Sequence, residues 1–108
     1  MTCDMSDEAM HKPPYTSFGN NSLFFIPTAG KFAGKAYRVA SAPVGAEFTG
    51  PCFSPDFETL FLSVQHPGEG TTDINKPVSN WPNGGKSMPR PAVIAIDGDA
   101  LEEIMAGN

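Results

Sequence analysis

The sequence predicts a mainly β fold, a single four-stranded antiparallel blade of a β-propeller with a long irregular loop and a short C-terminal helix. Residues 46–65 run as a strand, a tight turn and a second strand, and a polar loop follows, which is the order of elements in a propeller blade. The 108 residues include 11 Gly and 11 Pro, which indicates many turns and short strands. The pattern occurs once, without an internal repeat.

The chain divides into an irregular N-terminal arm (1–21), a blade region (22–98) and a short C-terminal helix (99–108). The arm is polar and is interrupted by Pro, Gly and Asn, which disfavour regular structure. Residues 23–26 are an apolar run closed by Pro27, typical of a strand buried on both faces. Residues 36–41 alternate in polarity, as a half-buried strand does.

A turn separates the third and fourth strands at Ser54, Pro55 and Asp56. Proline fixes φ at the second turn position, and the Ser and Asp side chains can bond to nearby backbone groups. The fourth strand then places three apolar side chains on one face: Leu60, Leu62 and Val64.

Residues 66–91 are rich in Pro, Gly, Asn, Ser and Thr, and a structureless loop of this length is unusual in a small domain. Trp81 is its one large apolar anchor, which we expect to fold back on the blade or on a neighbour. Residues 92–96 form a last apolar strand. Asp99 and Glu102 have the spacing of a helical capping box, and the helix that follows has an apolar face: Leu101, Ile104 and Met105.

The overall charge and hydropathy limit the possible partners. The formal net charge is −5, from 12 acidic and 7 basic residues, which leaves no basic stripe for nucleic acid. No apolar run approaches the ~20 residues needed to span a membrane. The N-terminus as written lacks the basic and apolar segments of a secretion signal, so we expect a cytoplasmic product without nucleic-acid or membrane partners.

Two cysteines, Cys3 and Cys52, are expected to be free thiols, since no export to an oxidising compartment is predicted. Cys52 lies beside Phe53 in an apolar strand. We therefore expect Cys52 to be a small buried side chain and not a ligand or a nucleophile.

Residues 46–69 resemble, nearly residue for residue, the C-terminal region of the PhoX-type alkaline phosphatases. That family carries a close variant of A-E-x-T-G-P-x-F-S/T-P-D-G-x-T-L-F-x-x-x-Q-H-P-G-E, and the likeness extends over about residues 20–96. The family usually has glycine after the turn aspartate, where this chain has Phe57. We therefore expect a strained or rearranged turn at this position.

The resemblance implies one metal ligand, Glu47, in the segment that matches G-x-E-x-T-G. In the family this glutamate looks like a ligand of a central cluster that contains calcium and iron, and such a cluster suits the hydrolysis of phosphate esters. From the residues alone, a solvated or backbone-capping carboxylate is the simpler interpretation of Glu47, and the ligand role comes from the resemblance. The family also has an arginine shortly before this glutamate to grip phosphate, whereas Pro43, Val44 and Gly45 stand here.

Other titratable residues are weaker candidates. His66 could act as an acid, a base or a ligand, although a structural hydrogen-bonding role is the simpler interpretation. Glu69 and Asp73 could bind calcium in the long loop, and His11 is a weaker candidate still. The catalytic residues stay unknown, because the remaining ligands in the family come from other blades.

Two hypotheses follow. In the first, the chain is a C-terminal fragment of a PhoX-like metal-dependent phosphatase, a hydrolase of phosphoric monoesters, and by itself is inactive and holds no calcium or iron cofactor. Its partners would then be the rest of a propeller and a small phosphate ester, and family members are typically exported from the cytoplasm. In the second, it is a non-catalytic blade that self-associates or pairs with a separate remainder, because a lone blade exposes apolar faces. The missing arginine also leaves the hydrolysis of non-phosphate esters open.

Overall fold

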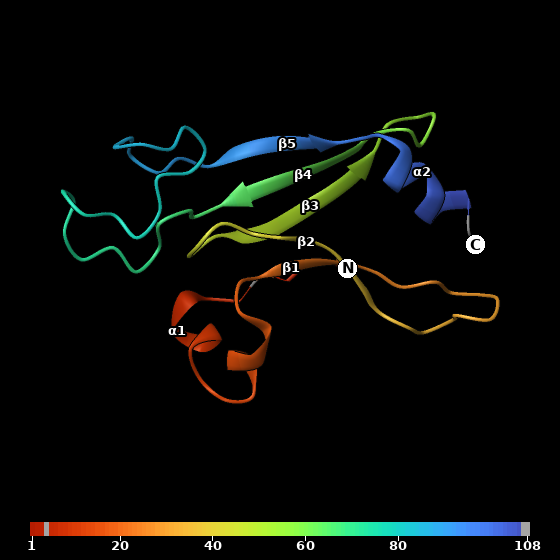
Figure 1. The fold of residues 1–108 in the computed structure, drawn as a ribbon, viewed down its shortest axis with the longest axis horizontal. Coiled ribbons are helices and arrows are strands. Elements are labelled where there is room, and N and C mark those ends of the chain that lie inside the picture. Colours follow the sequence, from red (N-terminus) through yellow and green to blue (C-terminus); the bar gives the residue numbers. More distant parts are fainter. Residues whose placement is uncertain (4, 107–108) are drawn as a thin grey trace.

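The computed structural model describes residues 1–3 and 5–106, which form five strands in two antiparallel sheets (Figure 1). The mainly β class is confirmed, but the single four-stranded sheet is wrong, because the strands divide between a two-stranded and a three-stranded sheet. The propeller architecture stays a prediction. The first sheet contains β1 (Ser22–Phe25) and β2 (Tyr37–Ser41), and the second contains β3 (Glu47–Phe53), β4 (Leu60–Gln65) and β5 (Ala92–Ile96) in that order.

The first residues of the chain connect the two sheets. Thr2 forms a β-bridge with Leu23 of β1. The Cys3 amide donates to the carbonyl of Ser22 at 3.0 Å, and the Phe48 amide of β3 donates to the carbonyl of Cys3 at 3.2 Å. Part of the arm that we expected to be irregular is thus extended backbone that satisfies hydrogen-bonding groups of both sheets.

Two short helical segments occupy the rest of the arm, which is therefore less irregular than expected. Helix α1 spans Asp7–Met10, and a 3-10 helix, η1, spans Tyr15–Phe18. Ser6 caps α1, because its hydroxyl oxygen accepts from the Ala9 amide at 3.3 Å. No helix among the described residues is long and apolar enough to cross a membrane.

One hydrophobic core joins both sheets. Phe48 pairs with Val64, and Leu62 pairs with Ile94, so these side chains lie on the same face of the three-stranded sheet. The alternation predicted for the fourth strand is confirmed: Leu62 and Val64 are fully buried. The cluster of buried side chains contains Leu23, Ala42, Ala46, Phe48, Leu60, Leu62, Val64 and Leu101.

The second half of β3 leaves this core. The pairing between β3 and β4 shifts between Thr49 and Cys52, where Gly50 has a φ of 61°. Such a bulge bends and twists a strand, and the residues after it are exposed. Both cysteines are free, as expected, but the buried position predicted for Cys52 is wrong, because its side chain is exposed beyond the bulge.

The turn between β3 and β4 forms where the sequence predicts it. The Ser54 hydroxyl donates to Asp56 Oδ1 at 2.6 Å, and the Glu58 amide donates to the same oxygen at 3.0 Å. These bonds hold the pKa of the exposed Asp56 carboxyl below its ordinary value of 3.8, and the bond from Ser54 has the larger effect. Phe57 has a φ of 62°, which confirms the strain expected where the family has glycine.

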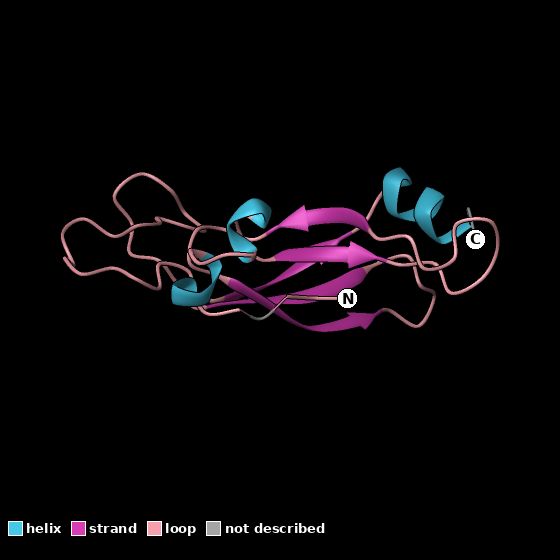
Figure 2. Cartoon of the chain, turned by 90° about the horizontal axis from the view of Figure 1, so that it is seen from below, coloured by secondary structure: helices cyan, strands magenta, loops and turns pink. Residues whose placement is uncertain are grey.

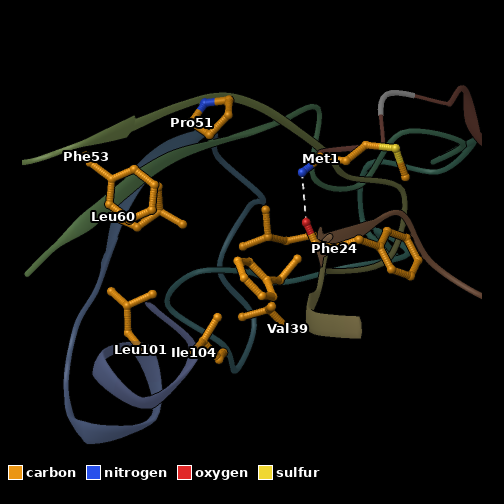
Figure 3. A pocket seen from close by; sticks show the side chains of 10 residues that line it. Met1, Phe24, Val39, Pro51, Phe53, Leu60, Leu101 and Ile104 are labelled. Atoms are coloured by element: carbon orange, nitrogen blue, oxygen red, sulfur yellow. Dashed lines mark hydrogen bonds between the residues drawn. The ribbon is translucent and has the colours of Figure 1, made fainter. Parts of the chain in front are cut away.

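Helix α2 (Asp99–Ala106) packs against one end of the sheets (Figure 3). It begins at Asp99 as predicted, but Asp99 lies inside the first turn, and the amides of Leu101 and Glu102 donate to the carbonyl of Gly98. Leu101 is buried, and with Ile104 it lines an apolar groove of about 240 Å³ whose other walls come from Met1 and from β1 to β4. The Met105 side chain and residues 107–108, which we included in this helix, lie outside the described residues.

The molecule is elongated, with extents of 48 × 32 × 19 Å. Its radius of gyration is 15.4 Å, against about 13 Å for a compact chain of this length. The loop between β4 and β5 extends from the end of the sheet opposite α2 (Figure 2). Trp81 folds back from this loop onto the core, which confirms the first of the two alternatives expected for it, packing on its own chain.

Candidate functional site

The predicted ligand, Glu47, is the first residue of β3 and lies at the end of the sheet from which the long loop extends. Its side chain is only 7% exposed. The paired residue on β4 is Gln65, whose Nε2 donates to Glu47 Oε2 at 2.7 Å. A buried carboxylate is costly unless hydrogen bonds or cations compensate its charge, and the bond from Gln65 contributes to this compensation and orients one carboxylate oxygen.

A close contact between two backbone segments shapes this end of the hairpin. The turn before Glu47 places Gly45 at a φ of 74°, and a Cβ built there would lie 2.6 Å from the carbonyl oxygen of Glu69. The Gly68 amide donates to the carbonyl of Val44 at 3.1 Å. The start of β3 and the segment after β4 are therefore in direct contact, and only glycine permits that approach at position 45.

Asn21 anchors the same region, and we assigned it no role from the sequence. It is 4% exposed. Its Nδ2 donates to the carbonyls of Met5 and Ala46 at 2.8 and 3.0 Å, and its Oδ1 accepts from the Met5 amide at 3.1 Å. One amide side chain thus joins the N-terminal arm to the residue before Glu47. An asparagine ahead of an apolar run is ordinary in sequence, so nothing marked this function.

Gln65 is the second residue whose role the sequence left unassigned. It stands in the motif that carries the family resemblance, and the strict period of two in a strand places it on the same face as Ser63 and Phe61. Only the register between β3 and β4 puts it opposite Glu47. A register argument from the turn at Ser54 could not have found this pair, because the bulge shifts the pairing by the time it reaches Glu47.

Both histidines lie near this end of the hairpin, His66 in the turn after β4 and His11 beside the turn before Glu47. His66 is exposed, has a φ of 53°, and its carbonyl accepts from the Glu69 amide at 2.9 Å, so its backbone closes the turn after β4. His11 lines a small cavity of about 20 Å³ together with Gly45 and Ala46. The structure therefore brings His11, the weakest candidate from the sequence, to the turn that precedes Glu47.

Asp73 has a local structural role. Its Oδ1 accepts from the Asn75 amide at 2.9 Å, and its carbonyl accepts from the Lys76 amide at 2.9 Å. These are the bonds of a tight turn stabilised by its first side chain. Within the part of the chain that the structure describes, no three His, Cys, Asp or Glu side chains form a metal-binding group.

This end of the hairpin offers one carboxylate, Glu47, that is oriented by a hydrogen bond. A carboxylate is a hard donor that suits calcium. In place of the arginine that the resemblance implies, the stretch 43–46 forms a turn closed by the Ala46 amide and the carbonyl of Pro43 at 2.9 Å. This turn carries no cationic side chain with which to bind a phosphate group.

Comparison with known proteins gives one match. The family model described as alkaline phosphatase PhoX matches residues 3–68, which include β1 to β4 and Glu47. No curated protein and no solved structure matches the chain. The long loop after residue 68, β5 and α2 lie outside the matched region.

Proposed function

Since the chain belongs to the PhoX family of alkaline phosphatases, we propose that it supplies one carboxylate ligand, Glu47, to the metal centre of a phosphomonoesterase. The observation that carries this proposal is the pairing of Glu47 with Gln65. The carboxylate is nearly buried, and one of its oxygens is held by an amide at 2.7 Å. A ligand that is oriented before the metal binds loses less side-chain entropy on coordination.

The fit to a cation is that of a single ligand. Calcium takes about six to eight oxygen ligands, and Glu47 offers at most two. The remaining ligands are proposed to come from other parts of a larger propeller, as the resemblance implies. When bound, the metal would stabilise negative charge on the phosphoryl oxygens and activate an oxygen nucleophile. The part of this chain is to position Glu47 and to exclude water from one side of it.

The surrounding contacts fit a positioning role. Asn21 holds the carbonyl of Ala46, and Gly45 lies against the backbone of Glu69. Both contacts fix the backbone directly ahead of Glu47, and both partner residues, Asn21 and Glu69, are distant from this turn in the sequence. Because such second-layer contacts commonly set the geometry of a metal ligand, their loss is expected to weaken metal binding even when Glu47 itself is unchanged.

The isolated chain is expected to be inactive. Purified chain is incubated with calcium, ferrous or ferric iron and an aryl phosphate, and phosphate release is compared with a protein-free control. Release at the control rate is expected, because one carboxylate cannot hold the cluster. Turnover above the control would show that this chain suffices for catalysis and would overturn the requirement for other parts.

The ligand role of Glu47 is tested in a chimera, in which residues 3–68 replace the matching segment of an active PhoX phosphatase. The calcium and iron content per chain is measured by mass spectrometry, together with phosphatase activity. We expect Glu47→Gln to lower both the calcium content and the activity. Glu58→Gln is the matched control, since Glu58 is an exposed glutamate in the same matched region.

The calcium content distinguishes a loss of the ligand at Glu47 from a loss of activity that has another cause. A chimera that binds metal but lacks activity would point to the missing arginine before Glu47, and the ligand role would stand if Glu47→Gln still lowers the calcium content. Calcium content and activity that are the same for Glu47→Gln and Glu58→Gln would refute the ligand role. Circular dichroism of each variant shows whether the chimera is folded.

A further inference from the structure

The open edge of β5 carries an inference that goes beyond the proposed function. β5 pairs with β4 on one side and forms the edge of the three-stranded sheet (Figure 1). Among the described residues, none makes a backbone hydrogen bond to β5 outside its ladder with β4. An edge strand presents a row of backbone donors and acceptors that can pair with another strand. β5 also lies outside residues 3–68, so its role is independent of the family match.

The strand β5 itself carries no charged side chain, proline or bulge that would protect its edge against pairing. Natural edge strands carry charged side chains, proline or bulges, whereas β5 is Ala-Val-Ile-Ala-Ile and pairs with β4 in unbroken register. Val93 is 67% exposed, and Ala95 beside it is also exposed. Both side chains lie on the face opposite the core, where strand addition would cover them.

We propose that β5 is a dimerisation edge, on which β5 of a second copy of this chain pairs antiparallel about a two-fold axis at Ile94. In this register Ala92 lies opposite Ile96 of the second copy, and Val93 lies opposite Ala95. The two three-stranded sheets then form one continuous sheet across the axis. Each copy uses the same strand for the contact and has one such strand, so no open edge of β5 remains after pairing. The assembly is therefore a dimer.

The charges that flank β5 select the antiparallel arrangement. Arg90 precedes the strand, Asp97 and Asp99 follow it, and all three residues are exposed. In the proposed register Arg90 lies opposite Gly98 of the second copy and therefore between the two carboxylates. The same complementary contact occurs at both ends of the strand pair. A parallel pair would instead place Arg90 beside Arg90 and aspartate beside aspartate, which is repulsive.

Self-association is tested by light scattering after size exclusion, on the full chain at about 1 to 500 μM. The expected mass rises to twice the 11.5 kDa of the chain. Val93→Lys places a charge on the edge and is expected to raise the dissociation constant by about tenfold or more. Val78→Lys is the matched control, since Val78 is an exposed valine in the loop, and should leave the dissociation constant unchanged.

The charge contribution is tested separately. Arg90→Glu should weaken the dimer, and Arg90→Glu combined with Asp97→Arg should recover most of the loss, because the reversed pair is again complementary. Lys76→Glu changes the net charge by the same amount at an exposed loop position and should have little effect. The difference should shrink as salt is added.

The register is tested by disulfide formation in a Cys3→Ser, Cys52→Ser background. Chains with Val93→Cys are mixed with chains with Ala95→Cys under oxidising conditions. Directly opposed residues lie within disulfide range, whereas residues two positions out of register do not. A disulfide-linked dimer should therefore form efficiently in the mixture and poorly in either preparation alone.

Three results would overturn the proposal. The first is a monomer at every concentration, with circular dichroism showing a folded chain. The second is a dimer whose dissociation constant responds equally to Val93→Lys and Val78→Lys. The third is a dimer that Phe61→Lys disrupts and Val93→Lys does not, since Phe61 is 42% exposed on the outer face of the central strand β4, opposite Ala95, and has no part in the open backbone edge of β5.

Discussion

The two ends of the hairpin formed by β3 and β4 are stabilised in different ways. At the turn end, Ser54 bonds to Asp56 and to Thr59 within six residues of sequence, and Asp56 and Phe57 are exposed. At the other end Glu47 is buried and paired with Gln65, and contacts arrive from Asn21 and from the segment at Glu69. The first end is held by local bonds and the second by residues distant in sequence.

This difference explains which end can carry a functional group. Local turn bonds form in solvent and contribute modestly, because water competes for each of them. Contacts between distant segments enclose a carboxylate and fix its orientation at the cost of ordering several loops. A substitution at the Glu47 end should therefore affect stability together with the metal binding proposed for Glu47, whereas one at the turn end should affect stability alone.

The largest effect is expected at Gly45. Gly45→Ala places a Cβ 2.6 Å from the Glu69 carbonyl at a φ of 74°, which should lower the free energy of unfolding by about 3 kcal/mol. Gly84→Ala is the matched control, because φ is 71° but no atom lies within 4 Å, and should cost about 1 kcal/mol. Urea denaturation measures both. Equal losses would mean that the contact with Glu69 contributes nothing.

The next effect is expected at Asn21. Asn21→Ala leaves the buried carbonyl of Ala46 and both backbone groups of Met5 without this partner, and should cost about 2 to 3 kcal/mol. Asn83→Ala, at an exposed loop residue, should change stability by less than about 0.5 kcal/mol. Hydrogen exchange should become faster at Phe48 and Glu47 in Asn21→Ala. Unchanged exchange there would show that Asn21 does not hold the start of β3.

At the turn end, Phe57→Gly should raise stability by about 0.5 to 1 kcal/mol, because glycine accepts a positive φ without strain. Part of that gain is offset by the lost contact between the rings of Phe57 and Phe53, whose centroids are 5.7 Å apart. Phe57→Ala removes the ring but keeps the strain, and so should be less stable than Phe57→Gly in thermal unfolding. If alanine and glycine are equivalent, the strain at position 57 is negligible.

The smallest effect is expected from the pH dependence of Asp56. Its pKa is lowered in the folded chain because the carboxylate accepts from Ser54 and from the Glu58 amide. The stabilisation is therefore fully present above the ordinary value of 3.8 and is lost as pH falls through the folded pKa. Carbon-detected NMR titration of the Asp56 carboxyl should show the lower pKa, and Ser54→Ala should return it toward the ordinary value. A titration that Ser54→Ala leaves unchanged would contradict this cause.

Local patterns in the sequence predicted most of the elements. Residues 92–96 form β5 as expected, and the turn at Ser54 lies between β3 and β4. Hydrophobic period and turn chemistry act over a few residues, so they place strands within a residue or two. They do not specify which strands pair, and the predicted four-stranded sheet was accordingly replaced by two sheets.

Family resemblance located Glu47 but not its surroundings. The residue opposite it, Gln65, and the anchor beneath it, Asn21, became visible only when the strand register and the path of the arm were known. Cys52 was placed in the core from its apolar neighbours, but the bulge at Gly50 turned that part of β3 outward. A bulge changes which face a side chain occupies without changing the hydrophobic pattern that predicts the strand.

The sequence by itself determined the strand segments, the strained turn at Phe57 and the family, because each depends on side chains that are near one another along the chain. The tertiary structure decided the division into two sheets, the insertion of residues 1–3 between them and the enclosure of Glu47. These features depend on backbone hydrogen bonds and contacts between segments about 20 or more residues apart. Many chain paths satisfy the same local preferences, and only the packing of the whole chain selects among them.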